Sequence, residues 1–386
     1  MTTHVFIVDD TTLKYHLEYM FAGTGSKNND VDFNQLHTTS LSPNTENILV
    51  GMMADGCRVR KDDLIIFYLQ AVTYNKKNGH DGMFFGVFQA VDDCVFLDRN
   101  DGKQFLEKKL GKSLTFRLKI KPYEVYAKGV TEWAALDEIN NICSPSQMLW
   151  SLIYRKLKGN RGNTMITIYE AERLINLISS ENNHQKLAIP ANHCLTYDAV
   201  NKCITTVSGT CNYSGRTDPL NIVPRLVSKY NRKNAHEVHL QMYITQNIGR
   251  GTNASLDRAL GILGKNLEWI GNEVSCGVGM RRIDVMVSVK ESETKRILIP
   301  IELKAVPAYK SNTFQLTRYI DWIEQYYIPN RTSIIQPVLI CKSGKALSDP
   351  IIQLFNDFNK RKGILPLIYI EYIINGNDIV FNQVAY

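Results

Sequence analysis

The first third of the chain alternates short apolar runs with polar clusters rich in Gly, Asn and Asp. Closely spaced runs of this kind are typical of strands separated by turns, and they predict a small barrel or curled sheet. The apolar spacing then becomes helical, so we expect an N-terminal α+β domain. The predicted strands cover residues 5–8, 63–68, 83–88, 94–97 and 114–120, and the predicted helices cover residues 147–155 and 167–180.

Residues 235–386 alternate helical and strand-like periodicity, which predicts an α/β domain with a mixed sheet. Residues 181–234 are polar and interrupted by Pro and Gly, which indicates a connector with some structure of its own. We therefore predict domains at residues 1–185 and 231–386, joined by a connector at 186–230. The C-terminal helices are expected over residues 235–247, 256–263, 313–327 and 349–360, and strands over 336–340 and 365–372, beside a hairpin within 281–306.

Composition adds only broad limits. The 386 residues exceed one ordinary hydrophobic core, and 44% apolar with 22% charged residues argues against a disordered or fibrous protein. The formal net charge of +7 fits a polyanionic partner and an ordinary soluble surface equally well. No run approaches the roughly 18 to 20 apolar residues of a membrane helix, and the first residues lack an export pattern. We expect a cytoplasmic protein.

The eight cysteines are spread over the chain, which is typical of reduced thiols in a reducing compartment. Cys194, Cys203 and Cys211 share one region, but the intervals between them are too wide for an ordinary zinc knuckle. Buried or strand thiols are therefore the favoured interpretation for these three residues.

Charged residues interrupt both apolar strands of "RRIDVMVSVKESETKRILIPIELKAV", residues 281–306. With a turn centred on Glu293, Asp284 and Glu302 are equidistant from the turn and face each other across an antiparallel hairpin. Lys304 shares their face, because side chains alternate along a strand.

Two opposed carboxylates repel each other, and Lys304 supplies a single positive charge against them. Mg²⁺ prefers carboxylate oxygens and would supply the missing charge, so the pattern favours a metal site. The alternative is a structural salt bridge of Asp284 or Glu302 with Lys304 or Arg282. Two amphipathic helices flank the hairpin in sequence and carry polar pairs one turn apart: Glu237 with Gln241, and Gln315 with Tyr319.

This order of elements resembles the PD-(D/E)XK nuclease superfamily, most closely the RecB-like nuclease domain of the NucS or EndoMS type. The matching stretches are "HEVHLQMYITQNI", "GNEVSCGVGMRRIDVMV", "ILIPIELKA" and "QLTRYIDWI", within about residues 231–345. The resemblance implies a restriction-endonuclease-like fold that hydrolyses phosphodiesters. It implies that Asp284, Glu302 and the Leu303 carbonyl bind Mg²⁺, with Mn²⁺ able to substitute, and that Lys304 orients or activates the attacking water.

Further roles follow from the same resemblance. Glu237 would complete the acidic cluster, although Asp257 competes for this role. Gln315 and Tyr319 would line the site and touch the DNA backbone. The family often shows Gly-Arg-Ile-Asp where this chain has Gly-Met-Arg-Arg-Ile-Asp, which leaves either Arg281 or Arg282 to meet a phosphate.

The N-terminal stretches "KDDLIIFYLQ", "GMFFGVFQAV", "RLKIKPYEV", "GVTEWAAL" and "YRKLKGNRGNTMITIYEAERL" resemble the PUA-like β-barrel of EVE and YTH domains, which hold a modified base in an aromatic pocket. The candidate pocket residues are Tyr68, Phe85, Trp133 and Trp150, with core packing as the alternative. The predicted DNA-contacting loop carries Arg155, Lys156, Lys158 and Arg161, with an ordinary solvated loop as the alternative.

Together these interpretations predict a Mg²⁺-dependent DNA endonuclease, used as a modification-dependent restriction enzyme. Its partners would be double-stranded DNA, with a modified base, and a second copy of the chain, because double-strand cleavage with one active site per chain suggests a homodimer. One alternative is a repair nuclease acting on mismatched or branched DNA. Another is a non-catalytic nucleic-acid-binding protein on a nuclease scaffold.

Overall fold

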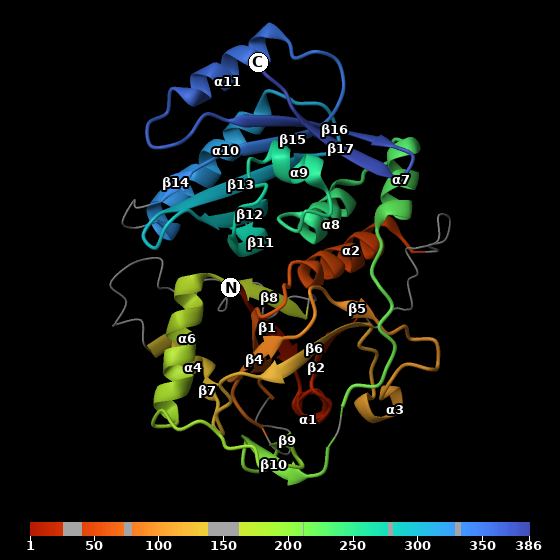
Figure 1. The fold of residues 1–386 in the computed structure, drawn as a ribbon, viewed down its shortest axis with the longest axis vertical. Helices are drawn as coiled ribbons and strands as arrows, with labels where there is room; N and C mark the ends of the chain where they lie inside the picture. The colour runs from red at the N-terminus through yellow and green to blue at the C-terminus, as the bar shows by residue number, and fades with distance from the viewer. Residues whose placement is uncertain (26–40, 73–78, 138–161, 211, 277–280, 329–332) are drawn as a thin grey trace. The chain divides into compact units, whose positions relative to one another are not determined.

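The computed structural model describes residues 1–25, 41–72, 79–137, 162–210, 212–276, 281–328 and 333–386 (Figure 1). The chain divides into two compact units. The first unit is formed by residues 1–31, 55–143 and 147–220, and the second by residues 32–54, 144–146 and 221–386. The protein is thus an α+β chain of two units, each built on its own sheet.

The first unit contains an eight-stranded sheet that curls into a half-barrel. Its strands run in the order β2-β6-β4-β3-β1-β8, with β5 on β6 and β7 on β4. Strands β1 and β3 are parallel, and the other pairs are antiparallel. The strands are β1 Thr3–Val8, β2 Phe21–Thr24, β3 Leu64–Leu69, β4 Met83–Ala90, β5 Phe96–Leu97, β6 Phe116–Pro122, β7 Val130–Thr131 and β8 Asn163–Ile166. Each predicted strand of this half is present, although the run at 94–97 forms only the short β5.

Helices pack on both faces of this sheet. The helix predicted over residues 167–180 is α6, Ile168–Glu181, which starts with a capping box between Thr167 and Glu170. It buries Leu174 and Ile178 against the sheet face that carries Tyr68. Helix α1, Asp10–Tyr19, places its buried His16 against Phe67 on the other face. The helix predicted over residues 147–155 lies outside the described residues.

Several elements were not predicted from the sequence. Helix α1 is one, and α2, Pro43–Cys57, is another; α2 contributes to the second unit as far as Ala54. In the connector, the strand-like piece expected near residues 203–207 is β10, Cys203–Ser208, whereas its hairpin partner β9, His193–Asp198, and the following helix α7, Val223–Asn231, were not predicted. The first unit also contains the short helices α3, Glu107–Leu110, and α4, Glu132–Asp137.

The second unit contains a seven-stranded mixed sheet in the order β11-β12-β13-β15-β16-β17, with β14 on β13. Strands β13, β15 and β16 are parallel to one another, and β11, β12 and β17 pair antiparallel with their neighbours. The strands are β11 Leu267–Ser275, β12 Arg282–Lys290, β13 Arg296–Lys304, β14 Ile334–Ile335, β15 Val338–Lys342, β16 Ile368–Asn375 and β17 Asp378–Gln383.

The helices of this unit agree with the predicted positions, with different ends. The predicted ones are α8 Glu237–Asn247, α9 Ala254–Ala259, α10 Ser311–Trp322 and α11 Asp349–Asn359, which join α7 and the part of α2 in this unit. The helix predicted over 256–263 ends early because Gly261 takes a left-handed φ of +68°. The helix predicted over 313–327 is α10 followed by a π-helical turn, Ile323–Tyr327. Among the described residues, none of the helices has the length and apolar character that a membrane span requires.

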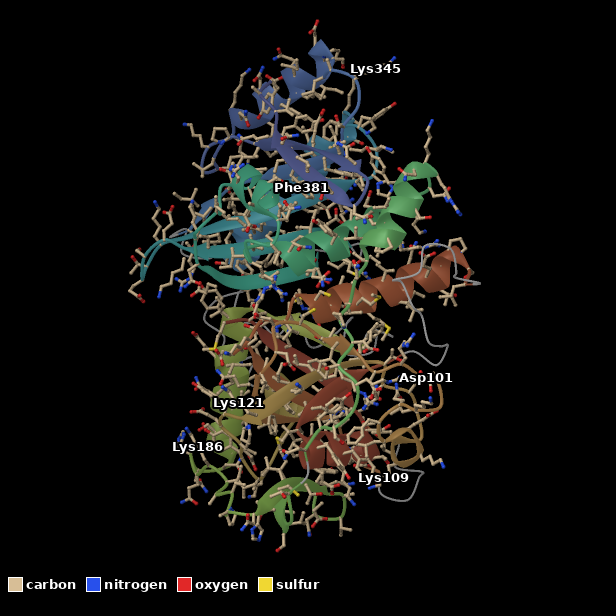
Figure 2. The ribbon with its side chains drawn as sticks, turned by 45° about the vertical axis from the view of Figure 1, so that its right-hand side comes forward. Asp101, Lys109, Lys121, Lys186, Lys345 and Phe381 are labelled. Carbon is tan, nitrogen blue, oxygen red and sulfur yellow. The ribbon has the colours of Figure 1, made fainter. Side chains whose placement is uncertain are left out.

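The two faces of the second sheet differ in chemistry. Val285, Ile301 and Leu303 point into an apolar core with Leu240 of α8 and Phe381 of β17, the latter labelled in Figure 2. Since side chains alternate along a strand, the neighbouring positions Glu302 and Lys304 point to the opposite face, which α10 contacts. The β13 strand therefore presents its charged residues away from the main core.

Candidate active site

The register of the β12–β13 hairpin brings Asp284 and Glu302 together. Its pairs run from Lys290 with Arg296 to Val285 with Ile301, so the next position pairs Asp284 with Glu302, as predicted. The Asp284 Oδ2 atom accepts a hydrogen bond of 2.8 Å from the backbone amide of Leu303. Asp284 is half-buried, and Glu302 is only 1% exposed. Two carboxylates thus meet across one hairpin.

Lys304 completes the predicted trio. Its ammonium group forms an ion pair with Glu302 Oε1, and its Nζ atom lies 3.8 Å from Oε1 of Glu237, the first residue of α8. The Tyr319 hydroxyl of α10 lies 2.6 Å from Glu302 Oε2 and 2.8 Å from the carbonyl oxygen of Arg282. A single hydroxyl proton is therefore placed between the acid and the β12 backbone, and α10 is tied to both hairpin strands.

The electrostatics of the cluster favour a cation. Burial, together with repulsion from Glu302, raises the pKa of Asp284 well above its ordinary value. Burial also raises the pKa of Glu237, where attraction from Lys304 only partly opposes it. Burial alone would lower the pKa of Lys304, but the surrounding carboxylates outweigh it and the net shift is upward. Three acids share one ammonium group, so added positive charge would stabilise the ionised cluster.

The side chains present fit a hard divalent cation. Asp284 and Glu302 offer carboxylate oxygens, and Mg²⁺ is commonly held by one or two carboxylates while it keeps several waters. Among the described residues, no set of three or more His, Cys, Asp and Glu side chains is arranged as a metal centre. A site here would thus depend on two carboxylates, waters and the predicted Leu303 carbonyl. Binding at Glu302 would also compete with its contacts to Lys304 and Tyr319.

The structure separates the two candidates for the upstream acid. Asp257 is buried elsewhere, where its carboxylate accepts hydrogen bonds of 2.7 Å and 3.0 Å from the amides of Gly249 and Gly251. The Asp257 carboxylate thus stabilises the turn that contains Gly249 and Gly251. Glu237, by contrast, lies beside Lys304. The geometry therefore favours Glu237 as the acid of the cluster.

The remaining predicted residues of this unit occupy different positions. Gln315 is half-buried on α10, one turn before Tyr319 and on the same stripe of the helix. Arg282 forms an ion pair with Glu273, whereas Arg281 is exposed at the start of β12. Contact of either arginine with a phosphate stays a prediction.

Sequence reasoning did not assign three other residues of the cluster. Gln241 of α8 donates a hydrogen bond of 2.6 Å to the carbonyl oxygen of Asp284, which ties this helix to β12. Cys276 is buried near the acids, and burial raises the pKa of its thiol to about 12. Cys341 of β15 pairs in register with Lys304, and burial raises its thiol pKa as well. The parallel pairing of β13 with β15 carries no local sequence signal.

The predicted aromatic pocket of the first unit is not assembled as expected. Tyr68 pairs with Phe84 and Phe67 with Phe85 across β3 and β4, so Tyr68 and Phe85 point to opposite sheet faces. Tyr68 donates a hydrogen bond to Glu132, and Phe85 packs on Tyr197, so both serve as core aromatics. Trp133 is 55% exposed. Trp150 lies outside the described residues, as do the predicted DNA contacts Arg155, Lys156, Lys158 and Arg161.

Three exposed lysines of the first unit lie on separate elements. Lys109, Lys121 and Lys186 extend outward from α3, β6 and the segment after α6 (Figure 2). Lys121 lies 3.3 Å from Asp62, and Lys186 lies 2.5 Å from Glu124. The charges of Lys121 and Lys186 are therefore partly compensated locally.

Comparison with known proteins adds no assignment. No protein-family model matches the chain, and no curated protein matches it in sequence. The nuclease and PUA-like resemblances therefore stay hypotheses, carried by the residues described above.

Proposed function

We propose that the second unit is a divalent-metal-dependent DNA endonuclease with a restriction-endonuclease-like fold. The observation that carries the proposal is the convergence of Asp284, Glu302 and Lys304 on one face of the β12–β13 hairpin. Glu237 and Tyr319 reach the same point from two helices. A group of acids around one lysine is an arrangement that can hold a hard cation and support metal-assisted hydrolysis of a phosphodiester.

The donors for the metal are Asp284 and Glu302, with the Leu303 carbonyl as a backbone ligand. A bound Mg²⁺ or Mn²⁺ would lower the pKa of water and offset the charge of the phosphate. Lys304, whose pKa is raised, is protonated at neutral pH. It therefore orients the attacking water as a hydrogen-bond donor and stabilises negative charge on the phosphate; it does not act as the base.

Two residues act through the acids. Tyr319 fixes the carboxylate of Glu302 by its hydroxyl, and Gln241 fixes the backbone of Asp284 by its amide. Both are positioning residues, because they contact the Glu302 carboxylate and the β12 backbone. Gln315 and Arg281 are the groups proposed to contact the DNA backbone.

We propose that the first unit is a PUA-like half-barrel that recognises a modified base. The order of its strands and helix α6 supports this role, whereas Tyr68 and Phe85 do not line one pocket. With one acidic cluster per chain, double-strand cleavage would need two copies. The complete chain would then be a modification-dependent restriction enzyme.

The second candidate function is repair cleavage of mismatched or branched DNA. It is favoured by two exposed aromatic side chains in the chain segment that follows Lys304, Tyr309 and Phe314. Such rings can stack on unpaired bases, which an intact duplex does not offer.

Digestion of a panel of DNAs tests these functions. Modified, unmodified and mismatched duplexes are incubated with the purified chain and Mg²⁺, with Asp284→Ala as the inactive control. Glu293→Gln is the matched control, because this acid lies in the turn of the same hairpin with its side chain 89% exposed. Cleavage restricted to modified DNA supports the restriction enzyme, and preference for mismatches supports repair. If no DNA is cleaved with Mg²⁺ or Mn²⁺, the result supports the alternative of a non-catalytic nucleic-acid-binding protein.

A further inference from the structure

Two thiols of the first unit lie in contact although they are 37 positions apart in the sequence. The Sγ atoms of Cys57 and Cys94 are 3.3 Å apart, and neither sulfur belongs to a disulfide. Cys57 is the last residue of α2 and is completely buried, whereas Cys94, in the loop between β4 and β5, is half-buried. The proposed function uses neither residue.

The chain segments around the two thiols are closely packed. A Cβ atom added to Gly56 would lie 2.4 Å from the Cγ2 atom of Val95, so only glycine leaves room for this side chain. Val95 is itself buried. Positions 56 and 57 at the end of α2 therefore pack directly on positions 94 and 95 of the loop.

Hydrogen bonds hold both segments in place. On the loop side, Asp93 accepts a hydrogen bond of 2.9 Å from the backbone amide of Lys61. On the helix side, Arg58 donates a hydrogen bond of 2.9 Å to the side-chain oxygen of Asn163 in β8. The sulfur atoms of a disulfide are about 2.05 Å apart, so the two thiols need to approach by only about 1.2 Å to form one.

A disulfide suits this pair better than a metal ion does. A structural zinc site takes four ligands. Among the residues that the structure describes, no group of three or more His, Cys, Asp and Glu side chains is placed to supply them. A disulfide needs only the two sulfurs and an oxidant. We propose that Cys57 and Cys94 form a reversible disulfide by exchange with a small disulfide such as oxidised glutathione.

The more exposed thiol reacts first. Cys94 loses its proton to solvent and attacks one sulfur of oxidised glutathione, which breaks the glutathione disulfide and releases one glutathione thiol. Cys57 then loses its proton and attacks the Cys94 sulfur of the mixed disulfide, which releases the second glutathione thiol. Two protein thiols are oxidised and one glutathione disulfide is reduced to two thiols, so the exchange is balanced.

The new bond would close the segment of residues 57–94. This segment contains β3 and β4, which pair with each other in the middle of the sheet. A cross-link that closes such a segment restricts the unfolded chain and thereby stabilises the folded state. The pair would therefore act as a redox-sensitive clamp on the first unit, independently of the cleavage chemistry proposed for the second.

Peptide mapping of the full chain tests the exchange. The native protein is incubated with oxidised glutathione, its remaining thiols are blocked with N-ethylmaleimide, and it is digested without reduction. A peptide pair linking Cys57 to Cys94 should be the main product at these two residues. In Cys57→Ser, Cys94 should instead keep one glutathione. A glutathione adduct that persists on Cys94 in the wild type would overturn the proposal, as would a Cys94 thiol that stays reduced.

The hairpin of β9 and β10 supplies a matched control in the same unit. Cys203 pairs with Asp198, four residues from Cys194, so these two thiols lie about 13 Å apart along the strands and should not become linked. A link between Cys194 and Cys203 of similar yield would show non-specific oxidation and count against the proposal.

Thermal unfolding tests the clamp and does not depend on the Cys57→Ser variant being folded. Oxidised wild type should melt roughly 5 to 10 °C above the protein reduced with dithiothreitol. Cys94→Ser changes a half-buried residue, so it should melt like the reduced wild type and show no shift with oxidised glutathione. An unchanged melting temperature in wild type that carries the link would refute the clamp.

Discussion

The acidic cluster should destabilise the folded protein when no metal is bound. Asp284→Asn removes one of two opposed charges while its amide oxygen can still accept the hydrogen bond from Leu303, which the structure gives as 2.8 Å. Facing side chains on paired strands lie about 5 Å apart, and two like charges at that distance repel by roughly 3 kcal/mol at an effective dielectric constant of about 20. Lys304 screens part of this repulsion. We therefore expect Asp284→Asn to stabilise the metal-free chain by roughly 1 to 3 kcal/mol.

Thermal unfolding in EDTA, followed by calorimetry, measures this gain. For a unit of this size, about 2 to 4 °C is expected per kcal/mol. Added Mg²⁺ should then stabilise the wild type and leave the variant unchanged, because a ligand that binds only the folded state adds to its stability. Glu293→Gln serves as the control for loss of a carboxylate from the same hairpin. A metal-free Asp284→Asn protein that melts at or below the wild-type temperature would refute the reasoning.

Three further predictions concern other contacts. Tyr319→Phe removes one hydrogen-bond donor from buried Glu302. Single-turnover cleavage should slow roughly tenfold while DNA affinity stays constant. Equal losses of cleavage rate and DNA affinity would argue against a positioning role. Burial and nearby Arg117 lower the pKa of His16 from 6.5 to about 3, so the first unit should lose up to roughly 4 to 5 kcal/mol as the pH falls across that interval. As the pH falls, His16 is protonated in the unfolded chain before it is protonated in the folded one. His16→Phe should therefore make the unfolding free energy, measured in denaturant melts, depend less on pH. The same pH dependence in wild type and variant would contradict this prediction. Thr167→Ala removes the cap of α6 and should cost about 1 kcal/mol by urea unfolding, against no loss for the exposed Glu172→Gln.

The hairpin of the second unit could be predicted because its sequence carries its own register. The polar turn around Glu293 and the alternation on both strands fix which residues face each other, and these determine the positions of Asp284, Glu302 and Lys304. No tertiary information was needed for this part of the site.

The choice between Glu237 and Asp257 required coordinates. Both acids lie in the first turn of a helix near the hairpin in sequence. Only the fold reveals that two glycine amides take up the Asp257 carboxylate. Similarly, the pairing of Cys341 with Lys304 depends on parallel strands that are distant along the chain.

Helix α1 shows why part of the first unit was not predicted. Its buried face includes Thr12 and His16, so polar residues occupy positions where an amphipathic helix usually has apolar ones. The aromatic pocket was misjudged for a different reason. Tyr68 and Phe85 belong to adjacent strands, and only their register shows that they point to opposite faces.

The rate of phosphodiester cleavage under single-turnover conditions tests the central claim most directly. We predict that the wild type and Glu293→Gln cleave DNA with Mg²⁺ and stop when EDTA is added, while Asp284→Asn and Lys304→Met remain folded and inactive. Cleavage by Asp284→Asn at the wild-type rate would contradict the account.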